Sequence, residues 1–150
     1  MTNESKSMVF LLNDGVKLVI SRKGVLKEFI TSVFKSEKRS LKTISIIFSS
    51  DSSVLKINKE YLKHNYLTDI ITFRLSKHRQ PIIADVYIST ERVRENSQKL
   101  QSKFNEELHR VIFHGVLHLC GYNDKSKSQK LAMRERENYY LSKYFKKRFT

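Results

Sequence analysis

The stretch HGVLHLCGYND, residues 114–124, holds two histidines four residues apart, followed by a glycine and an aspartate at intervals of three. Residues i and i+4 of an α-helix lie on the same face, so His114 and His118 can converge on one metal ion. Gly121 can take positive φ, end the helix and let the chain turn back. The carboxylate of Asp124 can then complete a three-ligand site at the end of that helix.

This spacing is that of the metzincin metalloproteases, H-E-x-x-H-x-x-G-x-x-H, with two substitutions. Gly115 stands where those proteases carry a glutamate general base, so peptide hydrolysis by that route is not expected. Asp124 replaces the third histidine. Aspartate is a zinc ligand at about 2.0–2.2 Å, but it is harder and charged, which widens the choice of metal. The alternative, two ordinary histidines of a partly buried helix, leaves the glycine and the aspartate unexplained.

The charge balance points to a polyanionic partner. The 150 residues include 29 Lys and Arg against 15 Asp and Glu, a net charge of +14. Such an excess favours RNA, DNA or a ribosome surface over a membrane, although a solvated basic surface is the alternative. No apolar run reaches the roughly 18 residues that a membrane helix needs. Cys120 is the only cysteine, which suits a cytoplasmic protein, and the length suits one domain spanning 1–150.

Hydrophobic periodicity predicts an α+β fold with a single mixed sheet of about four strands and helices packed mainly on one face. An Asp-Gly pair predicts a hairpin of strands 8–12 and 16–20. Further strands are expected at 41–50, 68–75 and 82–89, and helices at 21–36, 51–63, 90–100, 104–119 and 126–147. Asp51 or Ser52, and then Thr90, are the expected caps of the second and third helices.

The residues also resemble a known family. HGVLHLCGYND is similar to the signature H-G-x-L-H-L-x-G-Y-D-H of the YbeY family, bacterial endoribonucleases and ribosomal-RNA maturation factors. INKEYLKHNYLTDIITF (57–73) resembles its L-N-x-x-Y-R … T-D-V-L-S-F stretch, and ADVYISTERVRENS (84–97) resembles G-D-I-x-I-S … V … N-A. EELHRVIFHG and MRERE (133–137) are also in register. The resemblance covers most of the chain from about residue 41, and the first forty residues fit loosely.

The resemblance implies a zinc-dependent endoribonuclease that prefers single strands. It implies a role in ribosomal-RNA processing, including the 3′ end of the small-subunit RNA, and in ribosome quality control. Ribosomal RNA and the small ribosomal subunit would be the partners. Carried over by position, the ligands of one zinc ion would be His114, His118 and Asp124. The family usually has histidine at the place of Asp124, so another divalent metal remains open.

The sequence departs from the family at a second position. After the tyrosine of L-N-x-x-Y-R the family often has an arginine, but here Tyr61 is followed by Leu62, which cannot pair with a phosphate. Lys63 and His64 are adjacent substitutes and the candidates for a catalytic side chain. The nucleophile is otherwise expected to be metal-bound water or the RNA 2′-hydroxyl. The candidates for RNA binding are Lys63, Arg74 and Arg79.

Several other polar residues have a structural and a functional interpretation. Asp69 and Asp85 can orient the ligand histidines, although a turn or cap role is favoured. His109, about 140° around the helix from His114, is expected at the surface or in a structural role. Cys120 and Tyr122 are expected to pack. In the basic last helix, a solvated face and an RNA-binding face are equally consistent with the sequence.

Two rival functions follow from these departures. A ribosome-assembly or RNA-binding factor with a structural metal fits Leu62 and Asp124, but its zinc would be four-coordinate and closed. Cys120 is the only nearby residue that can close it. A small metalloprotease would need the carboxylate that Gly115 lacks.

Overall fold

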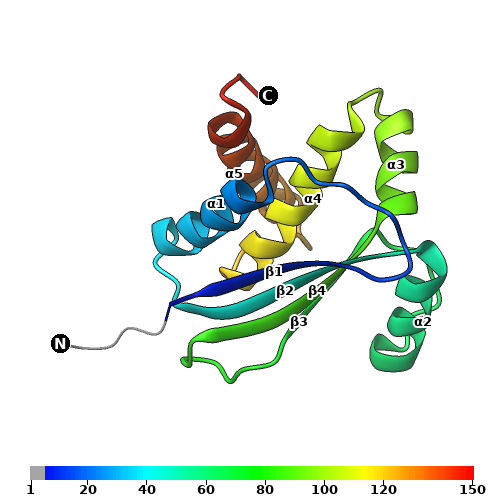
Figure 1. The fold of residues 1–150 in the computed structure, drawn as a ribbon, viewed down its shortest axis with the longest axis horizontal. Helices are drawn as coiled ribbons and strands as arrows, with labels where there is room; N and C mark the ends of the chain where they lie inside the picture. Colours follow the sequence, from blue (N-terminus) through cyan, green and yellow to red (C-terminus); the bar gives the residue numbers. More distant parts are fainter. Residues whose placement is uncertain (1–5) are drawn as a thin grey trace.

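The computed structural model describes residues 6–150, so the first five residues of the expected domain lie outside the described residues. Within this range the elements follow in the order β1 (Met8–Asn13), α1 (Lys23–Ser36), β2 (Leu41–Ser49), α2 (Asp51–Leu62), β3 (Ile70–Arg74), β4 (Ile82–Ser89), α3 (Thr90–Lys99), α4 (Phe104–Leu119) and α5 (Lys127–Phe145), as Figure 1 shows. Among the described residues, no helix combines the length and apolar character needed to cross a membrane.

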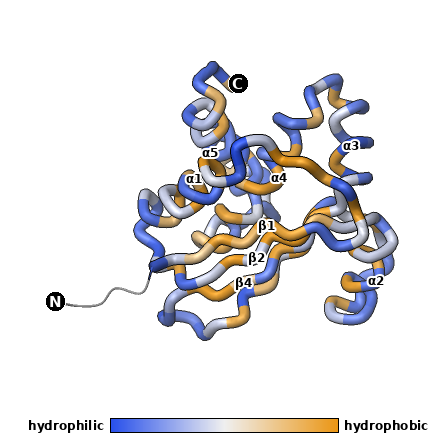
Figure 2. The backbone as a smooth tube through the Cα atoms, in the orientation of Figure 1, coloured by the Kyte–Doolittle hydropathy of each residue, from blue (hydrophilic) through white to orange (hydrophobic). Residues whose placement is uncertain are grey.

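The strands of residues 6–150 form one four-stranded mixed sheet in the order β1-β2-β4-β3. β1 and β4 each run parallel to β2, and β3 is antiparallel to β4. Helices α1, α3, α4 and α5 lie above one face, and α2 lies apart at one end of the sheet (Figure 1). Figure 2 shows apolar residues concentrated where the sheet meets these helices. The predicted α+β class with a mixed sheet is therefore confirmed.

The predicted hairpin of strands 8–12 and 16–20 is wrong. Residues 16–20 form no strand, and β1 pairs along its whole length with β2, from Met8↔Thr43 to Asn13↔Phe48. Gly15 does adopt a positive φ of 71° at the expected turn. From this turn the chain runs into α1 and returns to the sheet as β2. The helix serves as the crossover, because two parallel strands such as β1 and β2 cannot be joined by a tight turn.

The expected helix caps are displaced by one or two residues. Ser50 caps α2 by accepting a hydrogen bond from the Ser53 amide, and Ser89 caps α3 by accepting one from the Arg92 amide. The Asp51 carboxylate instead accepts a hydrogen bond from the Ser89 hydroxyl at 2.7 Å and pairs with Arg92. The serine hydroxyls sit just outside each helix, where they reach the open amides of the first turn.

Helix α4 lies close against the sheet because Gly115 has no side chain. A Cβ atom at this position would stand 2.7 Å from Cδ1 of Ile70 and 3.3 Å from Cγ1 of Val86. Most other residues of α4 are buried. A glutamate at position 115 would be driven into the sheet, so the structure gives a steric reason for the missing protease base.

The turn after α4 is held at both ends. Gly121 has φ 105°, and the amides of Gly121 and Tyr122 donate to the carbonyls of His118 and Leu117, both at 3.0 Å. This pair of bonds is the Schellman motif. Arg39 donates to the Cys120 carbonyl at 2.9 Å. Ser126 opens α5 with a capping box to Gln129. The short segment that carries Asp124 is thereby fixed between two helices.

Glu37, which follows α1, joins three parts of the helical layer. Its carboxylate accepts hydrogen bonds from Tyr122 at 2.8 Å, from Arg136 at 2.8 and 3.1 Å, and from the Tyr140 hydroxyl. Burial opposes ionisation of this carboxyl, but the hydrogen bonds from Tyr140, Arg136 and Tyr122 outweigh it and lower the pKa of Glu37. The carboxylate therefore ties the end of α1 to the turn after α4 and to α5.

Replacing Glu37 with Gln is expected to reduce the free energy of unfolding at pH 7 by about 1–3 kcal/mol, because Tyr122, Arg136 and the buried Tyr140 lose a charged acceptor. Since the folded pKa of Glu37 lies below its ordinary value of 4.5, this stabilisation is present above that pH. It is lost as the pH falls through the folded pKa. Urea unfolding from pH 7 to about pH 3 should therefore show the variant and wild type converging in acid. Exposed Glu28→Gln is the control, and a gap that stays constant to pH 3 would contradict this role.

Candidate metal centre

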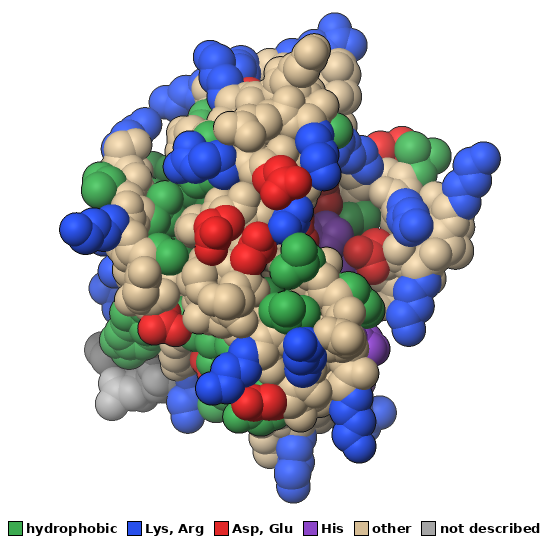
Figure 3. Space-filling model, turned by 90° about the vertical axis from the view of Figure 1, so that its right-hand side faces the viewer, with side chains coloured by type: hydrophobic (Ala, Val, Ile, Leu, Met, Phe, Trp, Pro, Cys, Tyr) green, Lys and Arg blue, Asp and Glu red, His purple; other side chains and the backbone are tan. Residues whose placement is uncertain are grey.

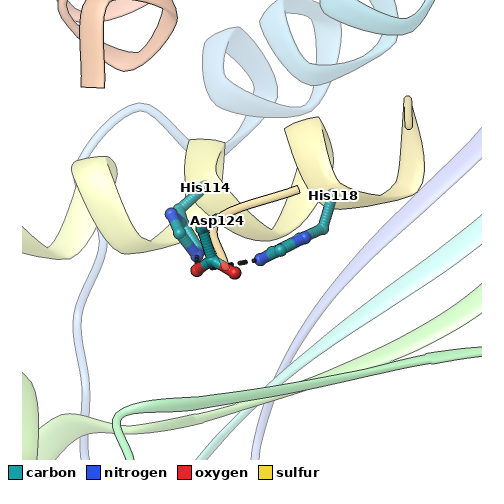
Figure 4. A group of neighbouring side chains, drawn as sticks. All are labelled: His114, His118 and Asp124. Carbon is teal, nitrogen blue, oxygen red and sulfur yellow. Dashed lines mark ion pairs between the residues drawn. The ribbon is translucent and has the colours of Figure 1, made fainter. Parts of the chain in front are cut away.

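Three side chains of the signature stretch converge in space (Figure 4). His114 and His118 point from the same face of α4, and Asp124 reaches them from the segment beyond Gly121. One carboxylate oxygen of Asp124 lies 3.3 Å from Nε2 of His114 and 3.3 Å from Nε2 of His118. One potential ligand atom from each residue lies within 4.8 Å of the other two. The helix repeat and the glycine turn thus bring together the residues that the sequence singled out.

The donor set and its spacing fit a zinc-sized cation. Zinc binds imidazole nitrogen and carboxylate oxygen at about 2.0–2.2 Å, so two donors of one tetrahedral ion stand about 3.3–3.6 Å apart. The two nitrogen–oxygen separations of 3.3 Å match this value. They exceed the roughly 2.7–2.9 Å of a charge-assisted hydrogen bond. The arrangement therefore suits an ion held between the side chains better than direct contact among them.

The cluster is open to solvent on one side. The side chains of His114, His118 and Asp124 are 22%, 29% and 39% exposed. Cys120, the residue that would close a structural site, is buried, and burial raises the pKa of its thiol to about 12. Its sulfur is not among the potential ligand atoms that are grouped with the cluster. Among the described residues, the potential ligands grouped here are the two histidines and the aspartate, an open three-ligand set.

A buried carboxylate from α5 fixes the orientation of His114. Nδ1 of His114 donates to Glu137 at 2.7 Å, and the other oxygen of Glu137 accepts from Arg110 at 2.9 Å. With its proton on Nδ1, the imidazole presents the lone pair of Nε2 to the cluster. Burial alone would lower the pKa of His114, but the hydrogen bond and charge of Glu137 outweigh it and raise that pKa.

Sequence reasoning assigned no role to Glu137, although a signal for it existed. Met133, Glu137 and Leu141 follow one another at intervals of four, so they share one face of α5. The two apolar residues are buried, and the side chain of Glu137 is only 6% exposed. A carboxylate on an apolar helical face needs a buried partner. Which partner it meets depends on the packing of α5 against α4.

The two aspartates proposed to orient the histidines have different positions. Asp69 is near His114, and burial raises the pKa of its carboxyl against the lowering effect of the His114 charge. Asp85 is on the other face of β4, because its neighbour Val86 points toward Gly115 of α4. Successive side chains of a strand alternate between faces. Asp85 therefore cannot reach the cluster, and the orienting carboxylate is Glu137.

A groove of about 890 Å³ runs beside the cluster and includes all three of its side chains. Basic residues of its lining are Arg39, Arg74 and Lys125, and His64 and His78 also line it. Of the RNA-binding candidates, Arg74 is in this lining, but its guanidinium donates to the carbonyls of Lys77 and Gln80 and holds the β3–β4 loop. Lys63 and Arg79 take left-handed turn conformations and are outside the described lining.

His109, Cys120 and Tyr122 make structural contacts. His109 is buried, not at the surface, with its ring 4.9 Å from that of Tyr144. Cys120 is buried in the core, and Tyr122 donates to Glu37. The face of α5 that includes Tyr140 is packed, and on its other side Arg136 and Lys143 lie over the Tyr139 ring. Figure 3 shows Lys and Arg side chains distributed around one face of the molecule, with acidic groups and a histidine nearer its centre.

Comparison with known proteins gives one consistent family. The family model described as endoribonuclease YbeY matches residues 16–145. Proteins named endoribonuclease YbeY are similar to this chain: that of Cytophaga hutchinsonii is 37% identical over 89% of this chain and 94% of its own length. That of Flavobacterium psychrophilum is 48% identical over 75% of this chain and 80% of its own. A solution structure from Thermotoga maritima shares the fold, with a TM-score of 0.61 and 21% identity over 92% of this chain and 89% of that one.

Glu137→Gln is expected to weaken zinc binding by about 10- to 100-fold, because the ring of His114 loses the charge that holds its proton on Nδ1. Zinc affinity would be measured by competition with a chromogenic chelator. The matched control is Glu135→Gln, an exposed change on the same helix, which should bind zinc within about twofold of wild type. Equal affinities for both variants would remove Glu137 from the metal site.

Proposed function

This chain belongs to the YbeY endoribonuclease family, and on that premise we propose that it is a metal-dependent endoribonuclease that prefers single-stranded RNA. The observation that carries the proposal is the open cluster of His114, His118 and Asp124 in the wall of a groove lined with basic side chains. A phosphodiester in that groove would meet the cluster from its solvent side.

The side chains around the cluster supply orientation and charge. Glu137 holds the ring of His114, and Arg39 and Lys125 place positive charge where RNA phosphates would lie. When bound, a zinc ion would polarise a phosphoryl oxygen and stabilise the charge that develops on it. RNA carries its own nucleophile in the 2′-hydroxyl, so the absence of a carboxylate at Gly115 excludes the protease route without excluding RNA cleavage.

We propose one Zn²⁺ ion as the cofactor. Two imidazole nitrogens are typical zinc donors, and Asp124 adds a harder oxygen donor that also suits other divalent metals. The aspartate offsets part of the ion's charge, so it should make zinc a weaker Lewis acid than a third histidine would. The site would therefore work with a less activated metal than the usual three-histidine set of the family.

The biological setting that we propose is ribosomal-RNA processing in the cytoplasm. Processing of the 3′ end of the small-subunit RNA and ribosome quality control are the family roles that the sequence resemblance implies. The charge of +14 supports ribosomal RNA and the small ribosomal subunit as partners, because lysine and arginine release counterions from phosphates. A membrane partner is not part of this proposal.

A second candidate function is a ribosome-assembly factor that binds RNA and holds a structural metal. Leu62 favours it, since this partly exposed apolar side chain lines the groove where the family often has an arginine. Against it stands the solvent-open cluster, because structural zinc sites are closed by a fourth protein ligand. The two functions differ in whether RNA cleavage depends on the cluster.

His118→Ala is expected to lose zinc and to reduce cleavage of an unstructured ribosomal-RNA fragment at least about 100-fold, because two ligands remain. Metal content and cleavage would be measured on the same preparations, with exposed Glu135→Gln as the control. Stoichiometric zinc in wild type with equal background cleavage in both proteins would favour the assembly factor. Wild type that binds neither zinc nor another divalent metal would refute the metal site itself.

Asp124→His restores the usual ligand set of the family and is expected to bind zinc more tightly than wild type, by about tenfold or more. Cleavage should be retained, whereas Asp124→Ala should lose both zinc and cleavage. Chelator competition and the same RNA assay check both variants. An alanine variant that binds zinc as tightly as wild type would show that Asp124 is not a ligand.

A further inference from the structure

Two aromatic side chains form an ordered pair in the loop between α2 and β3. The rings of His64 and Tyr66 are stacked, with centroids 5.1 Å apart and planes at 20°. A hydrogen bond of 3.0 Å joins the Tyr66 hydroxyl to Nδ1 of His64. Tyr66 nevertheless remains 57% exposed. Stacking covers one face of each ring, so the pair still presents aromatic surface to solvent.

A buried side chain holds this exposed pair in place. Asn58 of α2 is 1% exposed, and its amide group donates to the Tyr66 carbonyl at 3.0 Å. The backbone carbonyl of Asn58 also accepts a hydrogen bond from the His64 amide at 3.1 Å. Lys63 turns the chain between them with a φ of 56°. The loop is therefore fixed from within the fold, and the two rings are positioned before any ligand arrives.

The pair lines the same groove as the metal cluster. His64 and Tyr66 are part of its lining together with His114, His118 and Asp124, and Arg39 and Lys125 add positive charge. The exposed surface of this pair is aromatic. Its flat rings match the flat face of a nucleobase. The groove thus combines a surface for a base with charges for the sugar-phosphate backbone.

We propose that the stacked His64–Tyr66 pair is the binding platform for one unpaired base of the RNA strand whose phosphate lies at the metal cluster. This proposal rests on the proposed function, because it takes RNA as the ligand. A base in a duplex is already stacked and paired, so only an unpaired base is free to leave its neighbours for the platform. Such a platform selects single strands without reading sequence.

The same geometry gives His64 a different role from the catalytic one that the sequence suggested. Its Nδ1 is engaged by Tyr66, and its ring supports the tyrosine ring. Leu62 lines the groove nearby and is apolar, so it adds contact surface in place of charge. Affinity for the strand at this end of the groove would come from stacking more than from ion pairs.

The test compares two strands and two proteins. Binding is measured by fluorescence anisotropy with an unstructured RNA octamer and with an octamer of the same ribose-phosphate backbone that lacks every base. The protein is the full chain with EDTA, so that no strand is cut. Wild type should prefer the octamer that carries bases. Tyr66→Ala should bind that octamer about 5- to 100-fold more weakly and should bind the abasic octamer as wild type does.

Matched variants separate stacking from other effects. Tyr66→Phe keeps the ring and should bind within about threefold of wild type, whereas Tyr66→Leu keeps an apolar side chain without the ring and should behave like the alanine variant. Tyr61→Ala removes an exposed tyrosine that packs on Phe73, on the opposite face of the sheet, and should change neither affinity. An equal loss for both strands in Tyr66→Ala, or a loss for neither, would overturn the platform.

Failure of the proposed function has a separate signature. If zinc-loaded wild type cuts no RNA while the preference for bases still collapses in Tyr66→Ala, the platform stands and the nuclease proposal fails. If wild type cuts RNA and Tyr66→Ala shows the same KM and kcat, the nuclease stands and the platform fails. With both correct, Tyr66→Ala raises KM by about the same factor as the loss of affinity.

Discussion

The contact that the candidate site depends on most is the one between Glu137 and its two partners on α4. A carboxylate removed from water costs several kcal/mol unless hydrogen bonds and an opposite charge compensate it. Glu137 meets both needs, with Arg110 on one oxygen and Nδ1 of His114 on the other. The observed packing of α5 against α4 provides both partners. The packing that satisfies the buried charge therefore also sets the ring of His114.

Two glycines complete the constraint on the cluster. Gly115 lets α4 lie against β3 and β4, which buries most of the helix and leaves His114 and His118 at the edge of a groove. Gly121 ends the helix and returns Asp124 to the histidines. The Glu37 carboxylate holds the same turn from the side of α1. The three candidate ligands are thus held before a metal binds, which lowers the cost of ordering them.

The sequence predicted the elements whose signals are local or strongly periodic. The helix at 104–119, the strands at 82–89 and 41–50, and the left-handed turn at Gly121 are all present, because each depends on nearby residues. The hairpin prediction failed because the Asp-Gly signal says how the chain turns at Gly15, not which strand β1 pairs with. That pairing is set by contacts with β2 more than thirty residues away.

The residues of the candidate site also separate into those with a local signal in the sequence and those that only the packing of the fold brings into place. His114, His118 and Asp124 were found because helix periodicity and one glycine fix their spacing. Glu137 is 23 residues from His114, so its role depends on how α5 packs. The sequence did not decide whether Asp85 has the alternative role near the histidines, because the pattern of its strand does not say which face meets α4. The His64–Tyr66 pair gave no pattern in the sequence, since its order comes from the buried side chain of Asn58.

The most direct test of the metal centre is a crystal structure of the zinc-supplemented protein, with diffraction recorded on both sides of the zinc absorption edge. The account predicts one anomalous peak within about 2.0–2.2 Å of Nε2 of His114, Nε2 of His118 and a carboxylate oxygen of Asp124. It also predicts that Glu137 remains hydrogen-bonded to Nδ1 of His114. A peak elsewhere, or a zinc ion closed by Cys120 as a fourth ligand, would contradict it.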